Sequence, residues 1–242
     1  MSALRLEIAA NSLASALAAQ AGGADRVELC ENLGEGGCTP SCGTLALARE
    51  RLRVPLYVLI RPRAGDFLYD ALEREVMLRD IEHCVRLGAD GVVIGALDAD
   101  GDVDVAVCRE LVAAAGPLGV TFHRAFDAAR DQTRALEAII ALGCERVLTS
   151  GGSANALDGR QAIAGLVQQA RGRLGIMAGV GIDADHLREL ATRTGAQEFH
   201  ASAKALRASA MRHRNERLVG LDPDWVQTDL DRVRALTAAL HC

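Results

Sequence analysis

Apolar residues along the chain fall into short runs, rich in Val, Ile and Leu, that alternate with longer stretches of helical periodicity. Short apolar runs bounded by Gly, Asp or Pro are typical of buried strands. The chain contains eight such runs, and the strands that they predict cover residues 4–8, 26–30, 56–60, 92–94, 120–122, 146–148, 174–177 and 198–200.

Between the strands, apolar positions recur every three or four residues, as on one face of a helix. The predicted helices cover residues 13–21, 44–52, 71–87, 104–115, 132–142, 157–171 and 184–194. Residues of the types that cap helices precede several of them. The predicted caps are Asn11 or Ser12, Asp70 with Glu73, Asp131 and Asp183. From residue 202 to residue 242 the pattern is mostly helical.

A sequence repeat marks the junctions between helices and strands. GADRV at residues 23–27 returns as GADGV at 88–92, as GCERV at 143–147 and, more loosely, as GAQEF at 195–199. Each interval holds two strand–helix units, so the repeat accounts for eight strands. Strands that alternate with helices form parallel sheets, and eight units in about 250 residues close into a barrel.

The sequence therefore predicts an α/β fold with one domain over residues 1–242. This domain is a (β/α)8 TIM-like barrel with its core at about residues 4–203 and a C-terminal helical extension. An open doubly wound sheet is the alternative. We consider it weaker because no GxGxxG motif follows the first predicted strand.

The charge of the chain argues against a nucleic-acid partner. Lys and Arg number 27 against 32 Asp and Glu, which gives a net charge of −5. Nucleic-acid-binding domains usually carry a basic excess instead. Residues 204–217 are locally basic, which we interpret as a solvated helix face or as a positive rim that attracts a small anion.

The chain also lacks the patterns of exported and membrane proteins. Arg5 and Glu7 interrupt the first apolar run, which is unlike a secretory signal. No apolar stretch approaches the ~18 residues of a membrane span. Seven scattered cysteines, an odd number, favour reduced thiols over a disulfide framework. We therefore expect a cytoplasmic protein without a membrane partner.

Charged side chains gather at the C-terminal ends of the predicted strands, where TIM barrels carry their active sites. Carboxylates, arginines and histidines that converge there would bind a small polar, anionic ligand. Salt bridges that merely close the barrel mouth are the alternative, because each close pair is worth about 4 kcal/mol before desolvation. The candidate catalytic residues are Glu7, Glu28, Arg61, His123, Arg124 and His200.

Glycines and hydroxyl residues follow the later predicted strands. Loops at this position in TIM barrels often bind phosphate through backbone N–H groups. Tight turns with positive φ explain such glycines equally well. The candidate anion-binding residues, one of them in the loop after the third strand, are Asp66, Ser150, Gly151, Gly152, Gly179, Gly181 and Ser202.

Three thiols lie near one end of the predicted barrel. Cys30 has the same parity along its strand as Glu28, so both point to one face. Cys38 and Cys42 occupy the loop that follows. Cu(I) favours thiolate ligands, which makes these residues candidates for a metal site. A free Cys is also commonly a small apolar filler of the core.

With these residues in view, the sequence closely resembles the CutC copper homeostasis family. The resemblance runs from residue 4 to about residue 203. Its carriers are GGADRVELC at 22–30, IRPRAGDF at 60–67, TFHRAFD at 121–127, LTSGG at 148–152 and FHAS at 199–202. It implies a TIM-like barrel, a cytoplasmic location, a role in copper handling or tolerance, and a homo-oligomer (a dimer or a tetramer). It implies no particular reaction.

Two positions depart from the family pattern. Ala9 stands where members often carry a Cys, so the two-thiolate Cu(I) site suggested for some relatives is incomplete in this chain, and Cys38 is a candidate substitute. Val180 interrupts the usual Gly-rich turn and is expected to narrow that loop.

Three functions remain open from the sequence. The first is copper binding, with Cu(I) at the thiols described above. The second is an enzyme of lyase or isomerase type that acts on a small phosphate- or carboxylate-bearing metabolite. In this hypothesis Arg61 and Arg124 clamp the anion, and Glu28 or His123 is the general base. The third is a non-catalytic oligomeric scaffold.

Overall fold

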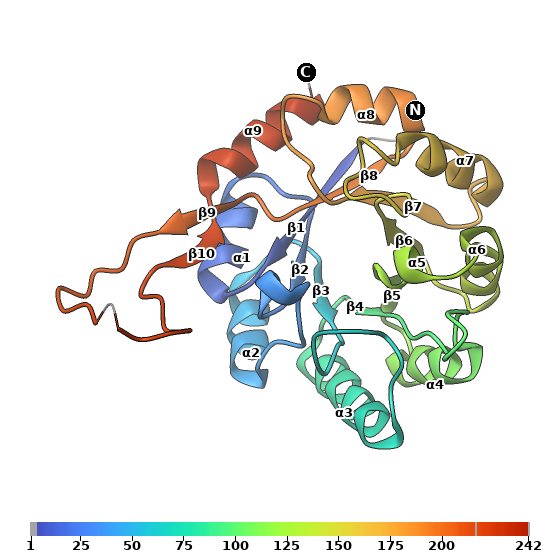
Figure 1. Ribbon diagram of the computed structural model, residues 1–242, viewed down its shortest axis with the longest axis horizontal. Helices are drawn as coiled ribbons and strands as arrows, with labels where there is room; N and C mark the ends of the chain where they lie inside the picture. The colour runs from blue at the N-terminus through green and yellow to red at the C-terminus, as the bar shows by residue number, and fades with distance from the viewer. Residues whose placement is uncertain (1–3, 216, 242) are drawn as a thin grey trace.

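Eight parallel strands close into a barrel whose strand order follows the sequence, with β8 pairing back onto β1 (Figure 1). The structure, a computed structural model, describes residues 4–215 and 217–241. The strands are β1 (Arg5–Ala10), β2 (Arg26–Leu29), β3 (Leu56–Leu59), β4 (Gly91–Ile94), β5 (Gly119–Phe122), β6 (Arg146–Thr149), β7 (Gly175–Gly179) and β8 (Glu198–Ala201). The predicted TIM-like barrel is confirmed.

Helices surround the strands in a ring (Figure 1). They are α1 (Leu13–Ala21), α2 (Cys42–Arg51), α3 (Ala71–Leu87), α4 (Val105–Ala115), α5 (Ala125–Ala128), α6 (Gln132–Ala141), α7 (Arg160–Ala170), α8 (Leu187–Thr194) and α9 (Leu230–His241). A 3-10 turn, η1 (Leu33–Glu35), follows β2. Within the described residues, no helix is both long and apolar enough to cross a membrane.

Most of the predicted caps are confirmed. The Ser12 hydroxyl accepts a hydrogen bond from the backbone N–H of Ser15, and Asp131 caps α6 in the same way. Asp70 and Glu73 form a complete capping box. The prediction for Asp183 is wrong, because its carboxylate accepts from the backbone N–H of Asp185 and α8 begins only at Leu187.

Helix α2 begins two residues earlier than predicted. The Ser41 hydroxyl accepts from the backbone N–H of Thr44, so Cys42 is the first residue of α2 rather than a loop residue. The short helix α5 was also not predicted. It begins directly after His123 and Arg124, so the chain leaves β5 in a helical turn.

The prediction of a mostly helical segment after residue 202 is wrong for residues 204–228. This segment holds two antiparallel strands, β9 (Lys204–Arg207) and β10 (Trp225–Thr228), and the loop between them projects from the barrel while β10 packs on α1 (Figure 1). Most of its residues are exposed, so it offers no apolar stripe that would hold a helix on the barrel. The two strands instead satisfy backbone hydrogen bonds by pairing with each other.

The last helix, α9, completes the outer ring. It contacts α1, α8 and β1, and buries Val233, Leu236 and Leu240 against them. It therefore takes the place of the helix that follows the eighth strand in a (β/α)8 barrel.

Tyr57 fills the interior of the barrel at its N-terminal end. The glycines beside it leave room for the ring: a Cβ at Gly91 or Gly119 would lie only 2.1 or 2.2 Å from Tyr57 atoms. Above Tyr57, the side chains of Cys30, Leu59 and Val93 form a small apolar cluster inside the barrel. The far larger core lies between the strands and the helices.

Candidate functional site

A layer of buried ion pairs crosses the barrel interior next to Tyr57. Arg26 pairs with Glu7 and, at 2.6 Å, with Glu198, and Arg146 pairs with Glu198 at 3.1 Å. Both guanidinium groups also lie over the Tyr57 ring, about 5 Å from its centroid (5.2 and 4.9 Å). These charges are matched within the barrel, so this layer supports the residues above it.

Glu7, Glu28 and His200 meet immediately above this layer. Strand β1 pairs with β8 so that Glu7 lies beside His200. The Nε2 atom of His200 is 2.5 Å from Glu28 Oε2 and 3.7 Å from Glu7 Oε1. The ligand atoms of the three residues lie within 4.8 Å of one another. Sequence reasoning predicted this convergence from strands that are distant in the chain.

The two carboxylates raise the pKa of His200. Burial alone would lower the pKa of His200, but Glu28 and Glu7 outweigh burial and raise it. Burial would likewise raise the pKa of Glu7, but Arg26 and His200 outweigh it and lower that pKa. Glu28 and His200 thus form a closely paired dyad, and Glu7 lies behind His200.

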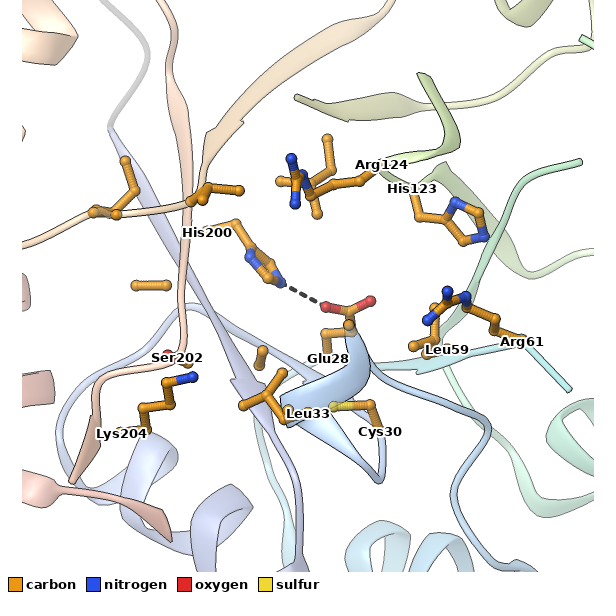
Figure 2. Close-up of a pocket in the computed structure, with 18 of the residues that line it drawn as sticks. Glu28, Cys30, Leu33, Leu59, Arg61, His123, Arg124, His200, Ser202 and Lys204 are labelled. Carbon is orange, nitrogen blue, oxygen red and sulfur yellow. Dashed lines mark hydrogen bonds and ion pairs between the residues drawn. The ribbon is translucent and has the colours of Figure 1, made fainter. Parts of the chain in front are cut away.

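A cavity of about 660 Å³ opens above this dyad at the C-terminal ends of the strands. Figure 2 shows Glu28 and His200 in its middle, Arg61 and His123 on one side, and Ser202 and Lys204 on the other. Five of the six candidate catalytic residues line the cavity, namely Glu28, Arg61, His123, Arg124 and His200. The sixth, Glu7, lies behind His200 and is almost fully buried.

Arg61 is a buried cation without an anionic partner. Its Nη1 atom donates to the carbonyl oxygens of Glu35 (2.9 Å) and Gly37 (2.8 Å), and Nη2 donates to that of Gly65 (2.8 Å). No carboxylate of residues 4–215 or 217–241 forms an ion pair with it, and its Nε is buried without a hydrogen-bond partner. The guanidinium lies over the Phe67 ring, 5.1 Å from the centroid.

His123 is buried beside Arg61 and differs sharply from His200. Its Nδ1 accepts a hydrogen bond from the backbone N–H of Ala125 (3.1 Å). Burial, reinforced by the charge of Arg61, lowers the pKa of His123 to about 3. The ring is therefore neutral and carries its proton on Nε2, an atom that is buried without a partner among the described residues. A general base must accept a proton readily, so this environment favours Glu28 over His123 for that role.

Asp127 occupies the loop that was predicted to bind an anion. Its carboxylate accepts hydrogen bonds from the backbone N–H groups of Ser150 (3.0 Å) and Gly152 (3.1 Å), and from the Thr149 hydroxyl (2.6 Å). It also pairs with Arg124 Nε at 2.8 Å. The loop after β6 therefore holds a carboxylate of the protein itself.

The other candidate anion-binding residues are dispersed. The backbone N–H of Gly151 donates to the Thr149 hydroxyl, and Asp66 is exposed and pairs with Arg63. Gly179 faces Leu148, where a Cβ would lie 2.5 Å from the side chain. Only two of this group line the cavity, namely Gly181 and Ser202.

The three candidate metal thiols do not form a close group among the described residues, although Cys30 and Cys38 interact electrostatically. Cys30 is buried on the cavity wall, and burial together with nearby Glu28 raises its pKa. Cys38 is half-buried, and Cys42 is exposed at the start of α2. In the described part of the chain, the group with three metal-ligand atoms close together consists of Glu7, Glu28 and His200, without a thiol.

The model of the CutC family matches residues 4–205. This chain belongs to the CutC family. A CutC family protein of Xanthomonas axonopodis pv. citri is 60% identical over 236 residues, which cover 98% of each chain. One of Bacteroides thetaiotaomicron is 51% identical over 217 residues, covering 89% of this chain and 87% of the relative.

Solved structures agree with this assignment. The crystal structure of a CutC protein from Streptococcus agalactiae, described as a candidate copper homeostasis protein, has a TM-score of 0.79 at 33% identity. The match covers 82% of this chain and 98% of that one. An aldolase, at a TM-score of 0.63 and 16% identity, shares the fold alone. The chain thus belongs to the CutC family and has a TIM-barrel fold.

Two residues within the CutC motifs contribute to the site but were not predicted, because the prediction considered only the residues at strand ends. Phe67 stands within IRPRAGDF and covers both Arg61 and His123, and Asp127 closes TFHRAFD and organises the loop after β6. Neither follows a strand directly, so strand position gave no signal for them. Only their position inside the family motifs could have identified them as residues of the site.

Proposed function

We propose that this CutC family protein is an enzyme that binds a small carboxylate- or phosphate-bearing metabolite and transfers protons with Glu28 and His200. Buried Arg61 carries this proposal, because its guanidinium donates to three neutral carbonyl oxygens and lies over the Phe67 ring, and no carboxylate of the described residues pairs with it. A buried charge without a counter-ion is costly. An anionic ligand in the cavity would supply the missing negative charge.

The surroundings of Arg61 support the same function. Lys204 adds positive charge to the cavity wall, which favours an anionic ligand. Glu28 carries a carboxylate suited to accept a proton, and the Nε2–H of His200 donates to it. Such a pair of groups fits lyase or isomerase chemistry, in which a proton is removed and returned.

Thermal unfolding with a panel of anions tests this proposal. The panel holds inorganic phosphate, sulfate, oxalate, pyruvate and glycolate. A ligand at 100 times its Kd adds about 2.7 kcal/mol to the free energy of unfolding. We expect this gain for wild type and for the matched control Arg63→Met, which alters a half-exposed arginine outside the cavity. Arg61→Met is expected to lose it. If no anion stabilises wild type more than folded Arg61→Met, the proposal fails.

Copper binding is the second candidate function. The predicted three-thiolate Cu(I) site does not fit the arrangement of Cys30, Cys38 and Cys42. Two carboxylates and an imidazole, as in Glu7, Glu28 and His200, suit a divalent ion such as Cu(II) better than Cu(I). A copper ion there would take the place of the proton on His200 Nε2.

Two titrations test copper binding. Cu(II) is added to wild type, Glu28→Gln and Cys30→Ala, and the fully reduced proteins are titrated with Cu(I) against a chromophoric chelator. We expect Glu28→Gln to weaken Cu(II) binding at least tenfold while Cys30→Ala leaves it unchanged. Affinities of micromolar or weaker that neither substitution alters would end this candidate.

A further inference from the structure

Arg61 and His123 hold two buried N–H groups that nothing in the described chain accepts. These are Nε of Arg61 and Nε2 of His123, and each residue is only 5% exposed. A buried donor without a partner costs about 1–3 kcal/mol, so structures rarely keep one without a reason. Here the two residues that carry these donors line one cavity.

The two side chains lie on the same wall, above Phe67. The Phe67 ring centroid is 5.1 Å from the His123 ring centroid and 5.1 Å from Arg61 Cζ. Figure 2 shows Arg61 and His123 next to each other, with Glu28 towards the middle of the cavity. A ligand oxygen bound at this wall would leave the rest of a small ligand facing Glu28.

Local structure fixes both donors in place. Three carbonyl oxygens use three of the five N–H groups of Arg61, so its plane is held and Nε–H is one of those left over. The hydrogen bond from Ala125 N–H to Nδ1 fixes the ring proton of His123 on Nε2. The ring approaches this position only because residue 95 is Gly: a Cβ there would lie 2.6 Å from the imidazole.

We propose that Arg61 Nε–H and His123 Nε2–H bind the carbonyl oxygen of the substrate, and that the substrate is a small carbonyl compound, such as a 2-oxo acid, with an acidic C–H bond. This assignment deepens the proposed function and rests on it. His123 is then an uncharged hydrogen-bond donor rather than a base. TIM-barrel enzymes are known to use a neutral imidazole in this way.

The proton transfer that follows is balanced. The Glu28 carboxylate takes a proton from the carbon next to the carbonyl group. The electron pair of that C–H bond forms a C=C bond, and the carbonyl π pair moves onto oxygen to give an enolate. Arg61 and His123 would stabilise this oxygen by donating hydrogen bonds to its developing negative charge. Return of the proton from Glu28 to the same carbon regenerates the carbonyl compound, so the balanced step is a reversible enolisation that exchanges the C–H hydrogen and needs no further reactant.

Oxalate, which resembles a planar enolate, and inorganic phosphate are the probes. The ring nitrogens of His123 are followed by ¹⁵N–¹H correlation at pH 7, and both affinities are measured by calorimetry. We expect the Nε2–H form of His123 and a downfield shift of that proton with oxalate. His123→Phe, which keeps an aromatic ring without the donor, should weaken oxalate binding at least tenfold, and His123→Gln, which keeps an N–H, should weaken it less.

Several results would overturn this assignment. One is a charged or Nδ1-protonated His123 ring at pH 7, and another is an unchanged affinity for oxalate in folded His123→Phe. If phosphate binds through Arg61 while oxalate does not bind, the role of His123 is wrong and the anion-binding function stands. If neither probe nor any other anion of the panel binds, the proposed function fails together with this assignment.

Discussion

His123 and His200 line the same cavity but have different neighbours. His200 lies between two carboxylates, which raise its pKa against the effect of burial. For His123, burial and the Arg61 guanidinium both lower the pKa, to about 3. Residue type alone predicted two histidines at the strand ends, but only their surroundings show that one pKa is raised and the other is lowered.

The lowered pKa of His123 predicts a specific loss of stability in acid. Between pH 6.5 and about 3 the unfolded chain binds a proton at this residue and the folded chain does not. The free energy of unfolding therefore falls with decreasing pH by up to ~1.4 kcal/mol per unit on this account. His123→Gln removes this contribution. Urea unfolding from pH 4 to 7 measures both slopes, and equal slopes would contradict the low pKa.

Glu7 is expected to stabilise the site from below. Glu7→Gln removes the buried partner of Arg26 and one neighbour of His200. Breaking a buried ion pair costs about 3–5 kcal/mol, and the lower end applies because Arg26 keeps Glu198. Chemical denaturation measures this cost. Glu75→Gln, in an exposed pair with Arg79, is the matched control and should change stability by less than about 0.5 kcal/mol.

At the scale of single elements, glycine packing inside the barrel gives a sharp test. Gly91→Ala in β4 would place a Cβ 2.1 Å from the Tyr57 ring, and such overpacking costs about 1–3 kcal/mol. Gly165→Ala in α7 meets nothing within 4 Å and should stabilise by about 0.5–1 kcal/mol. Thermal unfolding of the two variants should give shifts of opposite sign. A stable Gly91→Ala would mean that Tyr57 moves freely.

Strands and helix starts could be predicted from sequence because their signals are local. The Asp70–Glu73 capping box and the alternation along β2 depend on neighbouring residues only. The role of the loop after β6 could not be predicted, because its N–H groups are used by Asp127, which is distant in sequence. The backbone N–H groups of a glycine-rich loop can bind an anionic ligand or a carboxylate of the protein itself equally well.

At the scale of the whole molecule, the repeat of strand–helix units predicted a closed barrel and therefore that Glu28, Arg61 and His200 would meet. That meeting is what the structure shows. The structure of residues 204–228 could not be predicted from the repeat, because this segment belongs to no strand–helix unit. Its polar pattern fits an exposed helix and a hairpin equally well. The thiol site stays a prediction for a related reason: parity orients Cys30, but nothing in the sequence orients a loop or a helix start.

The projecting hairpin predicts where proteases act first. Residues 208–224 are mostly exposed, whereas α9 beyond them is buried on one face. Limited trypsin treatment should cleave first at Arg212, Arg214 or Arg217. The two fragments should elute together with unchanged far-UV circular dichroism, because α9 stays packed on α1 and α8. First cleavage within the barrel, or loss of the helical signal, would show that the hairpin supports the fold.

The stack of Tyr57, Arg26 and Arg146 has a kinetic consequence for any compound that binds in the cavity. These side chains fill the axis of the barrel beneath His200, and each is at most 7% exposed. A molecule therefore cannot traverse the protein from end to end. Substrate and product therefore use the same opening of the cavity. A product must leave before the next substrate binds, so product inhibition is expected to be competitive.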